Sequence, residues 1–217
     1  MLRGNAAVRN CLLAAGLMLA GTVFAVPDAR AADDMEQNER AVLEELNLAR
    51  SNPSAYARYV EEHKNSFKRG YGVEVDGRRV RTVEGINAVD EAIAFLKQAS
   101  PAPMLTASRS LTLSARDHVK DLGPRGMTGH VGTDQSQPTE RVRRHGTPKT
   151  TSGECISFGP VSARAIVIQL IVDDGVPGRD HRKLLFDPDF RVAGIAIGPH
   201  KSYAYMCVID FADQMSE

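Results

Sequence analysis

The chain has 217 residues, in which 27 lysines and arginines balance 27 aspartates and glutamates. This balance, together with the lack of a basic stripe with interleaved aromatic side chains, argues against a nucleic-acid-binding protein. Beyond the N-terminal region, the sequence holds no apolar run of membrane-spanning length, because residues 166–172 make at most two helical turns. The length suits one domain with a core of its own.

The N-terminus has the pattern of an export signal. Two arginines precede an apolar run at residues 11–25, which is too short and too rich in small residues for a membrane span. Ala29-Arg30-Ala31 fits the small-x-small rule of signal peptidase and predicts cleavage before Ala32. A buried N-terminal helix and an uncleaved anchor are the alternatives. We therefore expect a signal peptide at 1–31 and a single domain at 32–217, in a secreted or periplasmic protein.

Cleavage would leave two of the three cysteines, Cys155 and Cys207. An even pair in an oxidising compartment predicts one disulfide. Two buried free thiols are the alternative, since free cysteine is a common core residue.

Helical patterns dominate the first half of the chain. Residues 32–38 are polar and expected to be frayed, and apolar side chains then recur at helical spacing over 39–51. Asn52-Pro53 ends that helix and begins another, with proline at a first helical position. Residues 71–83 alternate around Asp76-Gly77, which predicts a hairpin.

Short helices and strands follow in the second half. Leu111, Ala115, His118 and Leu122 share one face of a helix that Gly123 is placed to cap. The other expected elements are helices at 86–98, 138–145 and 165–172 and strands at 154–158, 191–197 and 203–211. This order predicts an α+β domain with antiparallel strands covered by helices.

Three residues combine a metal-binding or acid–base side chain with an unusual position. His118 lies on the apolar face of its helix, Glu154 begins a strand, and His181 follows a glycine-containing turn. Two imidazoles and a carboxylate can bind zinc or act as acid and base around a water. The three are far apart in sequence, so no short ligand pair supports them. A hydrogen-bonded core histidine and a surface acid at a strand end are the alternatives for His118 and Glu154.

These residues and their flanks resemble a known family, the CAP superfamily of cysteine-rich secretory, antigen 5 and pathogenesis-related proteins, also called SCP-like. The resemblance covers residues 39–212 and is closest to a bacterial branch. The motifs that carry it stand, in order, at 47–53, 84–96, 113–118, 129–134, 152–159, 172–178, 180–182, 192–197 and 206–211.

The resemblance implies an α-β-α sandwich with a central antiparallel sheet and a cleft lined by two histidines and two acids. Some members hold zinc or another divalent ion there. Carried over by motif, the cleft residues are His118, Glu154 and His181. The second acid normally follows a tryptophan, which this chain lacks; Asp174 is the nearest placement and Asp173 the alternative.

Other family positions carry further expectations. His130 belongs to a loop motif and is expected to line the cleft or to position the loop. Cys155 and Cys207 fall in family strands of one sheet, and a bridge between them would fix Glu154. Residues 63–103 are an insertion that covers the cleft, extends it, or packs behind it.

Three functions remain open at this stage. The first is a binding module for a divalent ion and a small ligand, lipid or envelope partner, without an organic cofactor. The second is a metal-dependent hydrolase, peptidase- or esterase-like, in which Glu154 serves as general base on a metal-bound water. The third is a structural envelope protein. No oxyanion hole or activated serine is evident, which argues against catalysis.

Overall fold

The structure is a computed structural model that describes residues 29–68 and 72–216, with side chains for 37–67 and 73–216. The export signal expected at 1–31 lies outside these residues except for its last three. Within the described part of the chain, no helix has both the length and the apolar character that crossing a bilayer requires.

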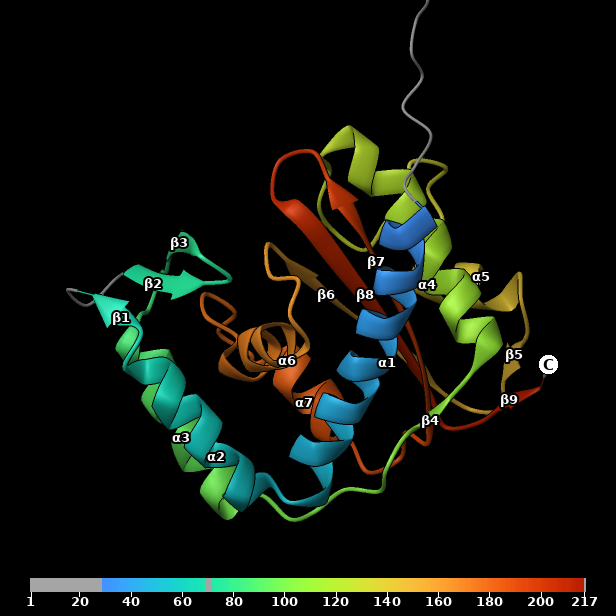
Figure 1. The fold of residues 1–217 in the computed structure, drawn as a ribbon. Helices are drawn as coiled ribbons and strands as arrows, with labels where there is room; N and C mark the ends of the chain where they lie inside the picture. Colours follow the sequence, from blue (N-terminus) through green and yellow to red (C-terminus); the bar gives the residue numbers. More distant parts are fainter. Residues whose placement is uncertain (1–28, 69–71, 217) are drawn as a thin grey trace, which may run out of the picture.

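Three helices form the first part of the fold. They are α1 (Ala29–Ser51), α2 (Pro53–Lys64) and α3 (Ile86–Gln98), and α3 packs along α2 (Figure 1). The break between α1 and α2 follows from Asn52-Pro53, where the Asn52 side chain accepts a hydrogen bond from the Ala55 amide at 3.1 Å. Residues 32–38, expected to be frayed, are helical and belong to α1.

The expected hairpin is present between α2 and α3. Strands β2 (Gly72–Val75) and β3 (Arg78–Arg81) are joined by Asp76 and Gly77, whose φ angles of 47° and 72° are both left-handed. Two left-handed residues make the tight turn that matches the twist of paired strands. A short strand, β1 (Phe67–Lys68), pairs with the outer side of β2.

The central sheet has the strand order β4-β7-β8-β6. Its long strands are β6 (Ser152–Phe158), β7 (Val192–His200) and β8 (Ala204–Ala212), and β8 pairs antiparallel with both of the others. The short edge strand β4 (Thr106–Ala107) runs parallel to β7, so the sheet is not wholly antiparallel. A separate pair joins β5 (Thr147–Pro148) to β9 (Met215–Ser216).

Helices cover both faces of this sheet. Figure 1 shows α4 (Arg109–Leu122) and α5 (Pro138–Arg143) on one side of β7 and β8, with α6 (Ala163–Val172) and α7 (Asp180–Phe186) on the other. Helix α1 packs against α6 and β7. The predicted α-β-α sandwich is therefore confirmed, with α7 as an additional helix.

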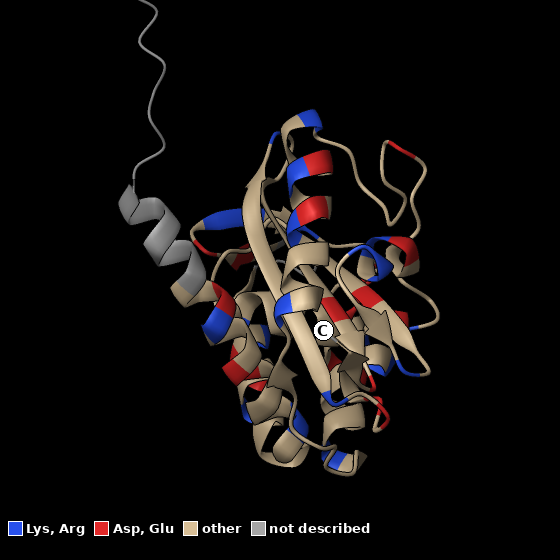
Figure 2. Cartoon of the chain, turned by 90° about the vertical axis from the view of Figure 1, so that its right-hand side faces the viewer, with Lys and Arg blue, Asp and Glu red and all other residues tan. Residues whose placement is uncertain are grey.

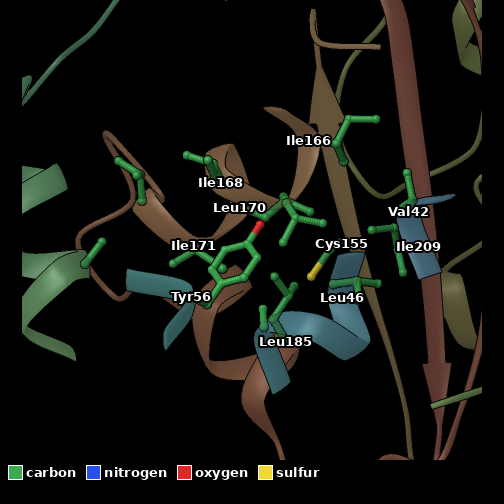
Figure 3. Close-up of a cluster of buried hydrophobic side chains, with 14 of the residues drawn as sticks. Val42, Leu46, Tyr56, Cys155, Ile166, Ile168, Leu170, Ile171, Leu185 and Ile209 are labelled. Atoms are coloured by element: carbon green, nitrogen blue, oxygen red, sulfur yellow. The ribbon is translucent and has the colours of Figure 1, made fainter. Parts of the chain in front are cut away.

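The alternation along β6 assigns each residue to one of the two layers. Cys155 belongs to the large core with α1, α6 and α7, whereas its neighbour Ile156 packs with α4. Figure 3 shows the Cys155 sulfur among Leu46, Tyr56 and Leu185. Because side chains alternate along a strand, Glu154 faces the α4 layer.

The expected Cys155–Cys207 disulfide is absent, and both thiols are buried and free. Cys155 lies opposite Ile209 and Cys207 opposite Ser157, so the cysteines are diagonal rather than paired. Diagonal neighbours are about 7–8 Å apart, beyond the roughly 4.4–6.8 Å between Cα atoms that a disulfide spans. Burial raises the pKa of both thiols, which keeps them protonated.

Gly123 is the C-cap residue of α4, as expected, and its amide donates to the Val119 carbonyl. Its φ of −54° is helical, and it begins a short 3-10 turn (Gly123–Arg125) that ends at the left-handed Gly126. A Cβ at Gly123 would lie 2.4 Å from the Pro199 carbonyl oxygen. A glycine is therefore required at this C-cap by the close packing against β7, not by a left-handed conformation.

Charged residues of both signs are interspersed over the surface. Figure 2 shows lysines and arginines next to aspartates and glutamates along the helices, with no extended area of one sign in that view. This distribution agrees with the balanced composition.

Candidate functional site

His118 lies beneath the site and is fully buried. Burial lowers its pKa, so the ring is neutral near pH 7 and its Nε2–H donates to the Gly129 carbonyl at 2.8 Å. Its Nδ1 is buried and, among the described residues, has no hydrogen-bond partner. This placement matches the core histidine that was the alternative reading of the sequence.

His130 and Glu154 form the first half of the site. The Nδ1–H of His130 donates to Oε1 of Glu154 at 2.7 Å, and Arg141 donates to Oε2 at 2.6 Å. The side chains of Glu154 and Arg141 are 1% and 2% exposed, whereas that of His130 is 46% exposed. A buried ion pair therefore orients a partly exposed imidazole.

Arg141 also holds the loop that carries His130. Its Nη1 donates to the carbonyls of His130 and Ser136, both at 2.9 Å. The same loop is tied to α4, because Asp121 accepts hydrogen bonds from the amide and hydroxyl of Thr133. The position of His130 is thus defined through its backbone as well as its ring.

His181 and Asp173 form the second half. The Nδ1–H of His181 donates to Oδ1 of Asp173 at 2.6 Å, and the His181 amide donates to Oδ2 at 3.0 Å. Asp173 ends α6 in a left-handed conformation, with a φ of 54°, and its side chain is 2% exposed. His181 lies in the first turn of α7 and its side chain is 22% exposed.

The two halves bring two imidazoles close together. The ring centroids of His130 and His181 are 6.4 Å apart, with an angle of 35° between the ring planes. Each Nδ1 is hydrogen-bonded to a buried carboxylate, so each Nε2 is the ring nitrogen left for another partner. No hydrogen bond is recorded for either Nε2 within residues 37–67 and 73–216.

Asp174 lies elsewhere and serves a different purpose. Its carboxylate accepts hydrogen bonds from the amides of Val83, Glu84 and Gly85, at 2.6, 2.8 and 3.0 Å. These groups precede α3, so Asp174 ties the insertion to the end of α6. The acid beside His181 is Asp173.

The expected zinc set of His118, Glu154, His181 and Asp174 is not assembled. Among the residues described, no group of three or more His, Cys, Asp or Glu side chains is arranged to hold a metal. The pairing found instead is His130 with His181, each backed by an acid. The role of Arg141 was not predicted from the sequence, because nothing in the sequence distinguishes it from the nearby Arg143 and Arg144.

A second buried acid adjoins Glu154. Asp210 lies directly opposite Glu154 on the neighbouring strand and is 1% exposed. Neither of its carboxyl oxygens has a hydrogen-bond partner among the described residues. Burial, with a further contribution from the Glu154 charge, raises the pKa of Asp210 well above its usual value. A raised pKa keeps this carboxyl neutral where ordinary aspartates are ionised.

This raised pKa predicts a pH-dependent effect of Asp210→Asn. Below the unfolded pKa of about 3.9, Asp210 is neutral in both states and costs the fold nothing. As pH rises from there through the folded pKa, the free energy of unfolding of the wild-type protein falls. Asparagine does not ionise, so the free energy of unfolding of the variant should increase relative to that of the wild-type protein as pH rises from 4 to 8. Urea unfolding across this range measures the difference.

Asp213→Asn provides a control of opposite sign. Burial acts to raise the pKa of Asp213, but the hydrogen bonds from Thr150 and Thr151 together outweigh it and lower the pKa. Its contribution is fully present above the unfolded pKa of about 3.9 and is lost as pH falls, so the stability deficit of this variant should stay constant from about pH 5 to 8 and shrink only below about pH 4. A stability difference for Asp210→Asn that does not change with pH would contradict the neutral buried carboxyl.

With the geometry described, comparison with known proteins identifies the class. A model of the CAP family, described as the cysteine-rich secretory protein family, matches residues 43–211. The match covers most of the chain, so the chain belongs to this family. The family resemblance inferred from the sequence motifs is thereby confirmed. No curated protein matches the chain.

Two solved structures are similar to part of the chain. One is an extracellular protein containing an SCP domain from Bacillus anthracis, with 17% identity and a TM-score of 0.45 over 59% of this chain and 40% of that one. The other is an outer surface protein from Borrelia burgdorferi, with 16% identity and a TM-score of 0.44 over 58% of this chain and 89% of that one.

Proposed function

We propose that the chain is an exported binding module that holds a divalent metal ion, zinc in the first instance, between His130 and His181. The facing pair of imidazoles, each with Nδ1 on a buried carboxylate, is the observation that carries the proposal. A carboxylate on the far ring nitrogen is the usual support of a zinc-binding histidine, because it fixes the tautomer and raises ligand basicity. Export rests on the N-terminal sequence pattern alone.

The separation of the rings is compatible with one ion between them. A Zn–N bond of about 2.0–2.1 Å puts the ion about 3.2 Å from each ring centroid, so 6.4 Å lies at the upper limit for a shared ion. A tetrahedral angle requires the rings to approach by roughly 1 Å. Water or the bound ligand would supply the remaining positions, which suits a binding site with open coordination.

The state of Glu154 favours binding over hydrolysis. A general base needs a carboxylate that can accept a proton from water. Both oxygens of Glu154 are engaged, one by His130 and one by Arg141, and the side chain is 1% exposed. Glu154 therefore acts as a support for His130.

The proposal predicts about one zinc ion per chain by isothermal titration calorimetry after chelator treatment. His130→Ala and His181→Ala should each abolish binding, because the proposed site has two protein ligands and each variant leaves only one of them. Asp173→Asn should weaken zinc affinity by about ten- to a hundredfold through loss of the second shell.

His145→Ala is the matched control. His145 is also a partly exposed histidine bound to a carboxylate, with its Nε2 2.7 Å from Oδ2 of Asp117, but it lies outside the His130–His181 pair. Its variant should bind zinc as wild type does. Unchanged zinc stoichiometry in the His130→Ala/His181→Ala double variant would remove the site.

A further inference from the structure

Strand β6 lies at one edge of the central sheet and pairs only with β8 on its inner side. The Gly159 amide, directly after β6, donates to the Tyr205 carbonyl of β8 at 2.9 Å. Backbone groups alternate in direction along an antiparallel strand, so the other odd-numbered residues of β6 also face β8. The N–H and C=O groups of Ile156 and Phe158 therefore point away from the sheet.

These outward groups are buried but only partly paired. The Phe158 carbonyl accepts a hydrogen bond from the Gln169 side-chain amide of α6 at 3.1 Å. Ile156 is 6% exposed, and within residues 37–67 and 73–216 no hydrogen bond is recorded for its outward amide or carbonyl. Buried backbone groups in proteins are paired in the great majority of cases. Ile156 thus presents a buried donor and acceptor that the rest of the fold does not pair.

A cavity of about 310 Å³ adjoins this edge of the sheet. From β6 it is lined by the two residues with outward backbone groups, Ile156 and Phe158. The opposite wall is the hairpin β2–β3, which presents the valines of one face, Val73, Val75 and Val80. Helix α6 contributes further lining, and most of the lining residues are apolar. An apolar space therefore adjoins backbone groups that need a polar partner.

The hairpin is fastened beside this edge at both ends. At the turn, Asp76 accepts hydrogen bonds from the amides of Val161 and Ser162, at 2.8 and 3.0 Å, and from the Ser162 hydroxyl at 2.6 Å. At the other end, Asp174 accepts the three amides that lead from β3 into α3. The hairpin is thus held in place opposite β6, and the space between them is a built feature of the fold.

We propose that this cavity binds a short, extended, apolar segment of another polypeptide, which pairs as a strand with β6 through the amide and carbonyl of Ile156. Strand addition to a sheet edge is an established mode of peptide recognition, in which main-chain hydrogen bonds give affinity and pockets for alternate side chains give specificity. The hairpin valines and α6 provide the apolar surroundings for those side chains. This site goes beyond the proposed metal site and requires neither zinc nor His130.

Two features favour a single peptide strand over other occupants. A hydrocarbon chain would fill the apolar space but would leave the amide and carbonyl of Ile156 unpaired, whereas a peptide satisfies both. The hairpin bounds the cavity opposite β6, and its volume is at the lower limit of small-molecule sites, about 300 Å³. The site therefore takes a short segment and not the edge of a second sheet.

Fluorescence anisotropy with labelled peptides tests the proposal on the purified chain in the presence of chelator. The probes are acetylated, amidated peptides of about six residues, a usual strand length, with valine, leucine or alanine at alternate positions and threonine between them. We expect saturable binding of at least one peptide, and none of its counterpart with a central proline, which removes a backbone donor. Binding of none of the peptides would overturn the proposal, as would binding of decanoate in their place.

Two N-methylated forms of the tightest peptide separate main-chain pairing from apolar contact. Alternate amides of an extended peptide point to the same side, so one form is methylated at the odd-numbered amides and the other at the even-numbered amides. One form should lose at least tenfold in affinity, because its methyl groups remove the donor to the Ile156 carbonyl and separate the strands. The other form should bind like the parent peptide. Equal affinity of the two forms would overturn strand pairing.

Amide hydrogen exchange followed by NMR locates the bound strand. In the free chain, the Ile156 amide should exchange faster than the amides of Cys155 and Ser157, which face β8. Bound peptide should slow exchange of the Ile156 amide at least tenfold and leave its two neighbours unchanged. An Ile156 amide whose exchange the peptide does not slow would contradict pairing at this edge.

Substitutions at Ile156 test the same hydrogen bond from the protein side. Ile156→Pro removes the outward amide without breaking the ladder to β8, since proline is tolerated on an edge strand where its nitrogen faces outward. Ile156→Ala is the matched control, because it shortens the same side chain and keeps the amide. Peptide affinity should be at least fivefold lower in the proline variant than in the alanine variant. Equal affinities in two folded variants would contradict the pairing.

A cavity-filling pair tests the location without changing the strand. Ala165→Phe fills the cavity from α6 and should weaken peptide binding at least tenfold, whereas Ala94→Phe, the same change at an exposed helical position outside the cavity, should not. Wild-type peptide affinity in a folded Ala165→Phe variant would overturn the assignment to this cavity.

The two proposals fail separately. Peptide binding in chelator by a chain that takes up no zinc would refute the metal site alone. Zinc binding at His130 and His181 without binding of any peptide would refute the strand site alone.

Discussion

Replacing Arg141 with alanine is expected to lower the free energy of unfolding by about 3–5 kcal/mol. The Glu154 carboxylate is 1% exposed and would lose its arginine partner. Breaking a buried pair from one side leaves a charge without solvent or counter-ion, which costs more than the pair itself contributes. The carbonyls of His130 and Ser136 would also lose a donor. Urea unfolding followed by far-UV circular dichroism measures the change.

Arg143→Ala is the matched control, because this arginine lies in the same short helix and is exposed. It should change the free energy of unfolding by less than about 0.5 kcal/mol. Adding Glu154→Gln to Arg141→Ala should recover part of the loss by removing the unpaired charge. A loss below about 1 kcal/mol in Arg141→Ala would show that Glu154 does not depend on this partner.

Gly194→Ala should be comparably damaging, at about 3 kcal/mol or more. A Cβ at this position of β7 would lie 2.0 Å from the Thr112 amide nitrogen and 2.1 Å from the Leu111 carbonyl carbon. Both are backbone atoms of α4, so no side-chain rotation relieves the contact, and the helix must move off the sheet. Gly194 lies opposite Asp210, in the same row as Glu154. The shift would therefore also disturb the buried acids, which urea unfolding reports.

Gly153→Ala on β6 gives the comparison. A Cβ there would approach Leu184 Cδ2 at 2.9 Å, the end of a flexible side chain that can rotate away. Its cost should be about 1 kcal/mol or less. Equal destabilisation by the two substitutions would mean that the close approach of α4 is not what requires Gly194.

The elements with local signals were predictable from sequence. Asn52-Pro53 and Asp76-Gly77 act through their own backbone preferences, so the helix break and the hairpin turn appear where expected. Helix α7 has no such signal, because it begins after the left-handed Arg179 without a side-chain cap. The role of Gly123 depends on Pro199, a contact across the fold that no local pattern contains.

The candidate site was predictable in part. Glu154 and His181, both named from the sequence, lie in the candidate site, whereas His118, named from its apolar helix face and the family motif, is buried beneath it. The His118 ring is hydrogen-bonded to the Gly129 carbonyl and does not reach the open part of the site. His130 faces His181 because Arg141 holds the loop from below, and sequence alone does not distinguish Arg141 from its exposed neighbours.

The position of the hairpin β2–β3 beside the central sheet has a consequence for aggregation. Strand β6 is the outermost long strand of the sheet, and Ile156 and Phe158 from it line the cavity beneath the hairpin. An uncovered edge strand is a template on which other chains can extend the sheet and aggregate. The hairpin, held by Asp76 and Asp174, stands before this edge, and the opposite edge strand has only two residues. The hairpin thereby also shields this edge of the sheet against self-association.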